Sequence, residues 1–210
     1  MSEENIFYCC RTDNVVKLLE YINTEGIEVV INLKDFDGWS LLHIAARWNS
    51  IKCLEILLDT ARGAIDVNAK NNNEETPLYI ASWYGSKECL EILLQNGGYK
   101  CINAKDIDGN TPLHDSVRNN SFECLEILLN VEGLDVNSKN RFGNTPLHTA
   151  ARYDSKEIII KALLEYGADV NIQNNKGKTF LDCIQNRELK KEMKEYIQLL
   201  STQDIKEPAS

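Results

Sequence analysis

The chain has 210 residues, a hydrophobic share of 43% and a charged share of 26%, a balance that is ordinary for a folded domain. Its formal net charge of -9 opposes nonspecific nucleic-acid binding, which needs a basic footprint, so we expect no nucleic-acid partner. No apolar run approaches the length of a membrane span, and the acidic start Met-Ser-Glu-Glu-Asn has no apolar signal core. These features predict an intracellular protein, cytoplasmic or nuclear, with no membrane partner.

One stretch of sequence recurs along the chain. The segment Asn103-Ala-Lys-Asp-Ile-Asp-Gly-Asn-Thr-Pro-Leu-His114 has related copies that end at His43, Tyr79, His148 and Asp182. The hydroxyl residues of the copies lie 34 to 36 positions apart, at Ser40, Thr76, Thr111, Thr145 and Thr179. A regular period of this length predicts a stacked array in which each unit contacts mainly its neighbours.

The Thr-Pro-Leu-His step, with Val-Asn at the end of the unit, resembles the ankyrin repeat. The resemblance covers nearly the whole chain and implies an all-α solenoid of helix-turn-helix units with short β-hairpin loops. We predict one domain over residues 1–200, with about six units including two caps, followed by a flexible tail over 201–210. The predicted units are 4–34 as the N-terminal cap, 35–70, 71–105, 106–139, 140–173, and 174–200 as the C-terminal cap.

The first unit, residues 4–34, lacks the Thr-Pro-Leu-His start, as expected of an end cap. Cys9 and Cys10 stand where later units have a pair of small alanines, which lets helices approach closely. The apolar residues in 15–19 predict a buried face on the following helix. The exit loop, residues 21–31, is longer than in the other units.

The internal units share one pattern, which the fourth unit illustrates. Thr111 is a good N-cap and Pro112 follows at the first helical position, where its missing N–H costs nothing. Asn119-Asn120 ends this helix, and a second, mostly apolar helix runs through residues 124–129. The third unit departs from the pattern, since Glu74 replaces the usual turn glycine and Tyr79 replaces the histidine.

The last unit begins at Thr179 and continues into a charged helix over residues 187–200. A C-terminal cap needs one polar side for solubility, so the charge fits a terminal position.

The seven cysteines suggest a metal site or a redox pair, but their spacing favours buried thiols. Cys53, Cys89 and Cys124 each begin the same Cys-Leu-Glu-Ile-Leu-Leu helix segment, one per unit, and no Cys-x-x-Cys pair occurs. Cys9 and Cys10 are adjacent, a poor arrangement for two ligands of one metal. Free cysteine usually behaves as a small buried hydrophobe, so we predict no metal and no cofactor.

The three histidines all occupy the Thr-Pro-Leu-His slot, at His43, His114 and His148. The resemblance implies that this side chain forms hydrogen bonds within and between loops. Catalysis would require a nucleophile or carboxylate that converges on one of them, and repeat geometry spaces them apart. No Gly-rich phosphate loop or nucleophile elbow occurs either. We therefore predict that the protein is not an enzyme.

Large side chains concentrate at the positions that read the partner in ankyrin repeats, which are the loop tips and the exposed end of the first helix. We predict that these residues bind the partner: Phe36, Trp39, Arg47, Trp48, Trp83, Tyr84, Ile107, Arg118, Asn119, Arg141, Phe142, Arg152 and Tyr153. Trp, Tyr and Arg are enriched in binding hot spots. The alternative is that these rings pack against neighbouring loops.

Basic residues recur in the same region. Lysines occupy one loop slot, at Lys34, Lys70, Lys105 and Lys139, and arginines occupy a slot on the first helix. The resemblance places both rows on the concave side. A basic and aromatic stripe favours a protein or peptide partner with acidic and apolar groups.

We therefore expect a monomeric protein-interaction module that holds its partner in a concave groove. Three alternatives stay open at this point: a regulatory or targeting domain of a larger protein, an inhibitor or chaperone that masks a partner enzyme, and an enzyme.

Overall fold

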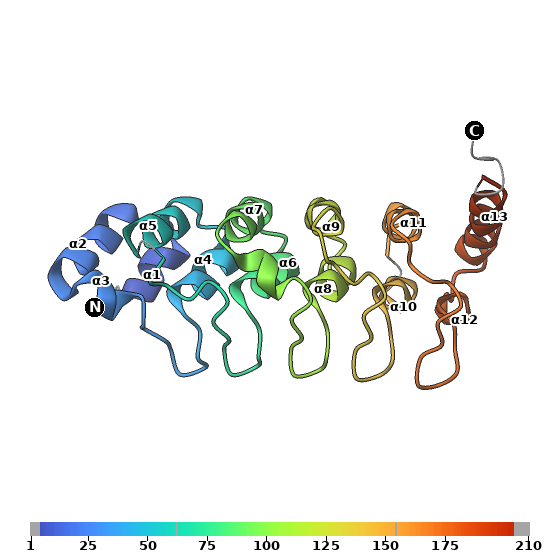
Figure 1. The fold of residues 1–210 in the computed structure, drawn as a ribbon, viewed down its shortest axis with the longest axis horizontal. Helices are drawn as coiled ribbons and strands as arrows, with labels where there is room; N and C mark the ends of the chain where they lie inside the picture. Colours follow the sequence, from blue (N-terminus) through green and yellow to red (C-terminus); the bar gives the residue numbers. More distant parts are fainter. Residues whose placement is uncertain (1–4, 62, 154, 204–210) are drawn as a thin grey trace.

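The computed structural model describes residues 5–61, 63–153 and 155–203. Figure 1 shows an elongated array of helix pairs in two layers, with long loops that project from the layer of the first helices. The first helices are α1 (Ile6–Arg11), α4 (Leu41–Trp48), α6 (Pro77–Tyr84), α8 (Pro112–Arg118), α10 (Pro146–Arg152) and α12 (Phe180–Cys183). The second helices are α2 (Val15–Glu25), α5 (Ile51–Ala61), α7 (Lys87–Gln95), α9 (Phe122–Leu129), α11 (Glu157–Glu165) and α13 (Arg187–Gln203). The predicted all-α repeat solenoid is confirmed.

A hydroxyl residue starts each first helix from the second unit onward. Thr76 Oγ1 accepts a hydrogen bond from the backbone N–H of Tyr79 at 3.2 Å, and Pro77 has no N–H to leave unsatisfied. Ser40 has no proline after it, yet its helix is capped as well. The backbone N–H of Ser40 donates to His43 Nδ1 at 3.1 Å, so histidine takes the place that Glu or Gln has in the usual capping box.

The loops follow the path of hairpins, but the part of the chain that the structure describes forms only one isolated β-bridge, between Lys34 and Ser40. Each loop is closed by a backbone hydrogen bond, such as the one from the Asp106 N–H to the Asn110 carbonyl at 3.0 Å, and a side chain reinforces the turn. In the fourth unit, Asp106 Oδ1 accepts hydrogen bonds from the backbone N–H of Asp108 at 2.9 Å and of Asn110 at 2.7 Å. Each turn is thus closed locally, by one backbone hydrogen bond and by an Asx-type side-chain acceptor, and no regular strand forms in the described residues where hairpins were predicted.

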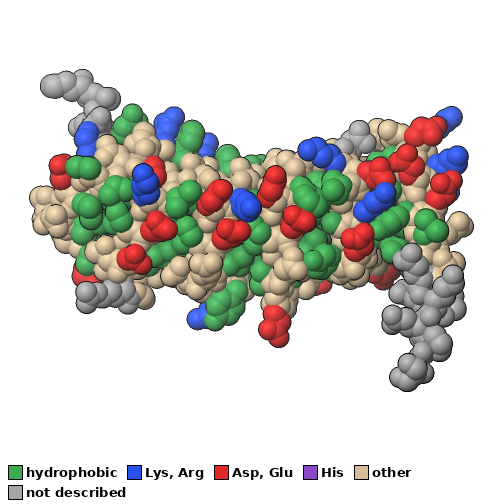
Figure 2. All heavy atoms as spheres, turned by 90° about the horizontal axis from the view of Figure 1, so that it is seen from above, with side chains coloured by type: hydrophobic (Ala, Val, Ile, Leu, Met, Phe, Trp, Pro, Cys, Tyr) green, Lys and Arg blue, Asp and Glu red, His purple; other side chains and the backbone are tan. Residues whose placement is uncertain are grey.

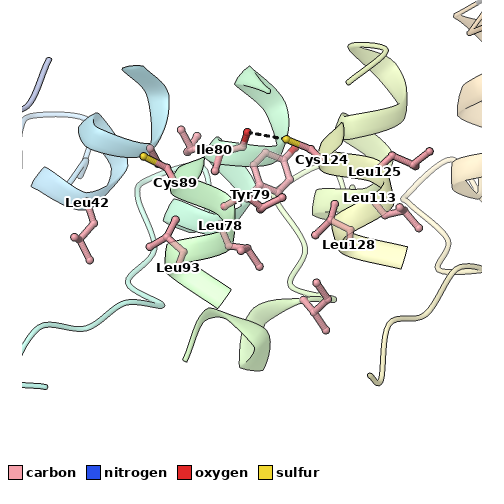
Figure 3. Close-up of a cluster of buried hydrophobic side chains, with 14 of the residues drawn as sticks. Leu42, Leu78, Tyr79, Ile80, Cys89, Leu93, Leu113, Cys124, Leu125 and Leu128 are labelled. Atoms are coloured by element: carbon pink, nitrogen blue, oxygen red, sulfur yellow. Dashed lines mark hydrogen bonds between the residues drawn. The ribbon is translucent and has the colours of Figure 1, made fainter. Parts of the chain in front are cut away.

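Successive units are joined through buried thiols as well as through apolar contacts. Figure 3 shows Cys89 and Cys124 on second helices, among leucines of the first helices. Cys89 Sγ donates to the Ala45 carbonyl at 3.7 Å, and Cys124 Sγ lies 4.0 Å from the Ala81 carbonyl, each in the preceding unit. Burial raises the pKa of Cys89 to about 12. These contacts agree with the interpretation of the repeated cysteines as buried structural thiols.

Leucines of the first helices form the centre of the stack, as the repeat pattern predicts. The side chains of Leu113 and Leu147 are 0% and 1% exposed. Because each lies between neighbouring units, truncation of either affects the contact between two units rather than one helix alone.

The two ends differ from the prediction in detail. The segment expected to be a loop over residues 21–31 is largely helical, since α2 extends to Glu25 and α3 (Ile27–Val30) follows Gly26, which has a φ of 85°. Val16, expected on a buried face, is exposed. The insertion after α7 forms the 3₁₀ helix η1 (Gly98–Cys101).

The C-terminal helix is also longer than predicted. The helix α13 extends to Gln203, so the first residues assigned to the flexible tail are helical. The remaining residues of that predicted tail, 204–210, lie outside the described residues.

Candidate partner-binding surface

The predicted binding residues fall into two groups. One group lies at the C-terminal ends of α4, α6, α8 and α10 and comprises Arg47, Trp48, Trp83, Tyr84, Arg118, Asn119, Arg152 and Tyr153. The other lies on the preceding loops and comprises Phe36, Trp39, Ile107, Arg141 and Phe142. Consecutive first helices pack against each other, so the first group forms a row across four units.

Arginines and aromatic rings alternate along this row. The Arg47 guanidinium lies 5.5 Å from the ring centroids of both Trp39 and Trp48, and 5.0 Å from the ring of Tyr84 in the next unit. The Arg11 guanidinium, from the first unit, lies 4.6 Å from the ring centroid of Trp48. The N-terminal half of the row is therefore tied together by cation–π contacts that cross from unit to unit.

The C-terminal half repeats the arrangement. The Arg118 guanidinium lies 4.9 Å from the ring of Trp83 in the unit before it and 4.9 Å from Tyr153 in the unit after it. Arg152 lies 5.9 Å from Tyr153. We call the whole set the arginine–aromatic ladder, and its members are Arg11, Trp39, Arg47, Trp48, Trp83, Tyr84, Arg118, Arg152 and Tyr153.

The sequence analysis missed Arg11. Its segment Tyr8-Cys-Cys-Arg-Thr-Asp13 aligns with the ends of the other first helices, and this places Arg11 in the same slot as Arg47. The signal was therefore present, but the first unit was interpreted only as a cap.

The arginines of the ladder have few acidic partners among the described residues. Within the described part of the chain, no hydrogen bond or ion pair holds the Arg47 guanidinium, and Arg118 has only a 4.0 Å contact with Asp115 Oδ1. Stacked rings cover the faces of the guanidinium, and its N–H groups remain available at the edges. Trp48 and Tyr84 are each 45% exposed and Tyr153 is 42% exposed, so the ladder presents both charge and apolar area to solvent.

Not every predicted residue faces outward. Trp39 and Trp83 are half-buried and pack against the hydrophobic core. Asn119 Nδ2 donates to the Trp83 carbonyl at 2.8 Å, so its amide links the ends of α8 and α6.

The loop tips carry the second group. Phe36 and Ile107 are exposed. Arg141 lies over Phe142 at 4.8 Å and forms a 2.6 Å ion pair with Asp108 of the preceding loop, so its charge is already neutralised within the protein.

A groove of about 680 Å³ connects the two groups in the C-terminal half. Arg118, Arg152, Tyr153 and Phe142 line it together with side chains that the sequence analysis did not select, among them Asp115, Lys176 and Lys178. The two lysines lie on the loop before α12, and they were overlooked because this last unit was interpreted as a cap.

The lysine row has a role that the sequence did not reveal. Lys105 Nζ donates to the Lys139 carbonyl at 2.7 Å, and Lys139 Nζ donates to the Gln173 carbonyl at 3.3 Å. Each of these lysines thus ties its loop to the next loop. The basic character available to a partner rests more on the arginines than on this row.

A buried polar group lies at the junction of the third and fourth units. Tyr79 donates a 2.7 Å hydrogen bond to Asp106 Oδ2. Nearby, Asp115 is 1% exposed, and its Oδ2 has no hydrogen-bond partner among the described residues. Burial raises the pKa of Asp115 to about 7, and the negative charge of Asp106 adds to the shift, whereas the Tyr79 hydroxyl and Arg118 oppose it.

The histidines join successive units. His114 Nδ1 accepts from the Thr111 backbone N–H at 3.1 Å, and its Nε2 lies 3.0 Å from the Asn144 carbonyl of the next unit. A backbone N–H can only donate, so Nδ1 is the acceptor and Nε2 carries the proton. Burial lowers the pKa of His43 and His114 to about 4, and it lowers the pKa of His148 as well.

Two further features bear on function. In residues 5–61, 63–153 and 155–203, no cluster of three or more His, Cys, Asp and Glu side chains could hold a metal ion. Over the same residues, no helix has the length and apolar character needed to cross a membrane.

Comparison with known families identifies the fold. The family model for ankyrin repeats in three copies matches residues 6–106, 64–140 and 113–205. The chain therefore belongs to the ankyrin-repeat family, whose members are generally protein-interaction modules and typically not catalytic. No curated protein matches the chain significantly.

Proposed function

We propose that this protein binds a protein or peptide partner along the arginine–aromatic ladder and the adjoining loops, and that it performs no catalysis. The ladder is the observation that carries the proposal. It combines exposed Trp and Tyr rings with stacked arginines, of which only Arg118 has an ion pair among the described residues, and these residue types dominate binding hot spots. A surface of this kind suits a partner with acidic and apolar groups.

The opposite face offers a different chemistry. Figure 2 looks down on the second helices, where acidic side chains are interspersed with hydrophobic and basic ones. Glu55 and Glu126 are exposed there, on α5 and α9. An acidic partner would be repelled by such carboxylates and attracted to the ladder, which favours the first-helix side as the concave binding groove.

The setting of the protein is part of the proposal. All seven cysteines are free, and five of them are buried in apolar surroundings. Free thiols persist in a reducing compartment, so we place the protein inside the cell. We further propose that it acts as a monomer.

Partner capture followed by mutational mapping tests the proposal. Proteins cross-linked to the chain in extracts of its source cell would be identified by mass spectrometry, and the recovered partner would be titrated against variants. Trp48→Ala and Tyr153→Ala should each weaken binding by about thirty-fold, because truncated aromatic anchors typically cost 2 kcal/mol or more. Both rings are well exposed, so neither change should unfold the chain.

The matched controls are Glu55→Ala and Glu126→Ala on the opposite face. They should leave the affinity within about two-fold of the parent, since rim charges change affinity little. If the glutamate variants lose binding and the aromatic variants keep it, the partner binds the second helices and the proposal is wrong.

A further inference from the structure

The arginines of the ladder are not evenly spaced. Arg11, Arg47, Arg118 and Arg152 occupy the same slot in the first, second, fourth and fifth units. The third unit has Trp83 in that slot and Tyr84 after it. The surface therefore consists of two arginine pairs that flank an aromatic centre.

Aromatic rings of the third unit contact one arginine of each pair. Its Tyr84 ring lies 5.0 Å from the Arg47 guanidinium, and its Trp83 ring lies 4.9 Å from the Arg118 guanidinium. The two rings thus hold the inner arginine of each pair from opposite sides. Stacking orders a planar guanidinium before any ligand arrives, so less side-chain entropy is lost when it binds.

The chemistry of these arginines defines the ligand group. A guanidinium with covered faces and available N–H edges is suited to bidentate pairing with a carboxylate. Single-stranded nucleic acid fits less well, because its bases need open aromatic faces, and guanidinium groups already occupy faces of these rings. The net charge of -9 also opposes a polyanion with one charge per nucleotide.

Repeat geometry defines the spacing. The helices α4, α6 and α8 pack side by side in sequence. Neighbouring packed helices lie roughly 8–10 Å apart, so Arg47 and Arg118, two units apart, are separated by roughly 16–20 Å. An extended peptide advances about 3.3 Å per residue, so this distance corresponds to about five or six residues.

We infer that the ladder recognises an extended peptide segment with acidic residues on both sides of an apolar centre, the inner acidic residues being about five or six positions apart. This inference rests on the proposed function and specifies its partner. The carboxylates pair with the two arginine pairs, and the apolar centre packs on the area of Tyr84 and Trp83 that the guanidinium groups and the core leave exposed.

Synthetic peptides test the inference on the full chain. The probe is a fluorescein-labelled peptide with two glutamates on each side of a central leucine, with the inner glutamates five or six positions apart and serine at the remaining positions. The reference peptide has the same composition with all four glutamates at one end. Fluorescence anisotropy should show that the flanked peptide binds about ten-fold more tightly, with an affinity that falls as salt is added.

Arginine-to-lysine changes link the preference to the stacked groups. Arg47→Lys and Arg118→Lys each keep the charge but lose the planar fork, so each should weaken the flanked peptide by about ten-fold and abolish its advantage over the reference peptide. The matched control is Arg187→Lys, an exposed arginine at the start of α13, which should change nothing. Thermal unfolding of every variant checks that the fold is intact.

The outcomes separate the inference from the proposed function. Equal affinity for the two peptides, or no response to either lysine variant, overturns the spacing inference. If in that case Tyr153→Ala still weakens the captured protein partner, the groove binds a partner with a different pattern and the proposed function stands. If a single-stranded oligonucleotide of the same length binds more tightly than the flanked peptide, the surface recognises nucleic acid and the inference is wrong.

Discussion

The third unit and the fifth unit share one helix-turn-helix plan, and three of the equivalent positions at which they differ are informative. The third has Glu74, Tyr79 and Trp83 where the fifth has Gly143, His148 and Arg152. Each difference changes how the unit meets its neighbours rather than how it folds. The comparison shows that, in this stacked array, fold and junction chemistry are set by different residues.

The junction residue illustrates the point. His148 accepts from the Thr145 backbone N–H at 3.3 Å and approaches the Lys178 carbonyl of the next unit at 2.9 Å. Tyr79 spans the same gap by donating to the Asp106 carboxylate. The histidine junction is neutral, whereas the tyrosine junction places a charge near the buried Asp115. The two junctions should therefore respond to pH with opposite signs.

The largest expected effect concerns what the two units share. Leu78 and Leu147 occupy the same slot, and each is 1% exposed. Leu78→Ala and Leu147→Ala should each lower the free energy of unfolding by about 2–5 kcal/mol, because each removes buried methyl groups and leaves a cavity. Chemical denaturation measures the change. Closely similar losses would show that the apolar stacking is equivalent in the two units, and a midpoint unchanged from the parent in either variant would contradict the assigned burial.

The second effect belongs to the junction of the third and fourth units. The pKa of Asp115 is raised from 3.8 to about 7, so the folded state holds this proton more tightly than the unfolded state does. Stability contributed by the protonated group is therefore lost as the pH rises through about 7. The asparagine in Asp115→Asn cannot ionise. The free energy of unfolding of this variant should therefore fall by about 2 kcal/mol less than that of the parent between pH 5 and pH 8.

Urea denaturation of the parent and the variant at both pH values measures this dependence. The control is Asp108→Asn, which removes a partly exposed carboxyl group of the adjacent loop. This variant should keep the change in the free energy of unfolding that the parent shows between the two pH values. A parent whose stability is flat from pH 5 to pH 8 would show that Asp115 ionises without penalty.

The third effect converts one junction into the other. Burial lowers the pKa of His43 and His114 from 6.5 to about 4, so the folded state binds fewer protons than the unfolded state between these values. Their stabilising contribution is present above about pH 6.5 and is lost as the pH falls. Tyr79→His should add one more such group. Its free energy of unfolding should then fall by about 1–2 kcal/mol more than that of the parent between pH 7 and pH 5.

Denaturation midpoints of Tyr79→His and the parent across this pH range provide the measurement. Tyr79→Phe serves as the control, since it also removes the hydroxyl, which opposes the raised pKa of Asp115, but adds no titrating group; the effect of the imidazole is the difference between the two variants. If Tyr79→His loses no more stability at low pH than the control does, the introduced imidazole stays accessible to protons and does not form the histidine junction.

The sequence predicts the shared features well and the individual ones poorly. The caps and buried leucines recur at one period, so Thr111, Pro112 and Leu113 could be assigned from pattern alone. The stacking of Arg118 between Trp83 and Tyr153 depends on how side chains of three units meet in space, which no local pattern contains. The helix α3 was missed for a related reason, since it occurs in a segment that no other unit repeats.

The burial of Asp115 is a feature that the repeat pattern contains but that the sequence analysis did not use. Asp115 occupies the slot held by Ile44, Ile80 and Thr149 in the other units, and a slot filled mostly by apolar residues elsewhere predicts burial. Comparison of equivalent positions therefore indicates a carboxylate that is at least partly buried, although Tyr8 in the same slot of the first unit is exposed. The size of its pKa shift, however, depends on Asp106 and Tyr79, which only the packing of the units brings near.

The smallest expected effect concerns the turn of the third unit. Glu74 adopts a φ of 62°, whereas Gly143 adopts 73° at the equivalent position without a side chain. A residue with a Cβ pays a steric cost of roughly 1–2 kcal/mol in this left-handed region. The ion pair between Glu74 and Lys70, at 3.1 Å, is exposed and stabilises the fold by only a few tenths of a kcal/mol.

Glu74→Gly should therefore stabilise the protein by about 0.5 kcal/mol, after allowance for the larger conformational entropy of glycine in the unfolded chain. The reverse change in the fifth unit, Gly143→Glu, should be much more harmful. A Cβ at Gly143 would lie 2.7 Å from the backbone nitrogen of Asn175, so the next loop would have to move as well. Thermal unfolding of both variants compares the two turns directly. If Glu74→Gly destabilises the protein instead, the Lys70 pair outweighs the backbone strain in this turn.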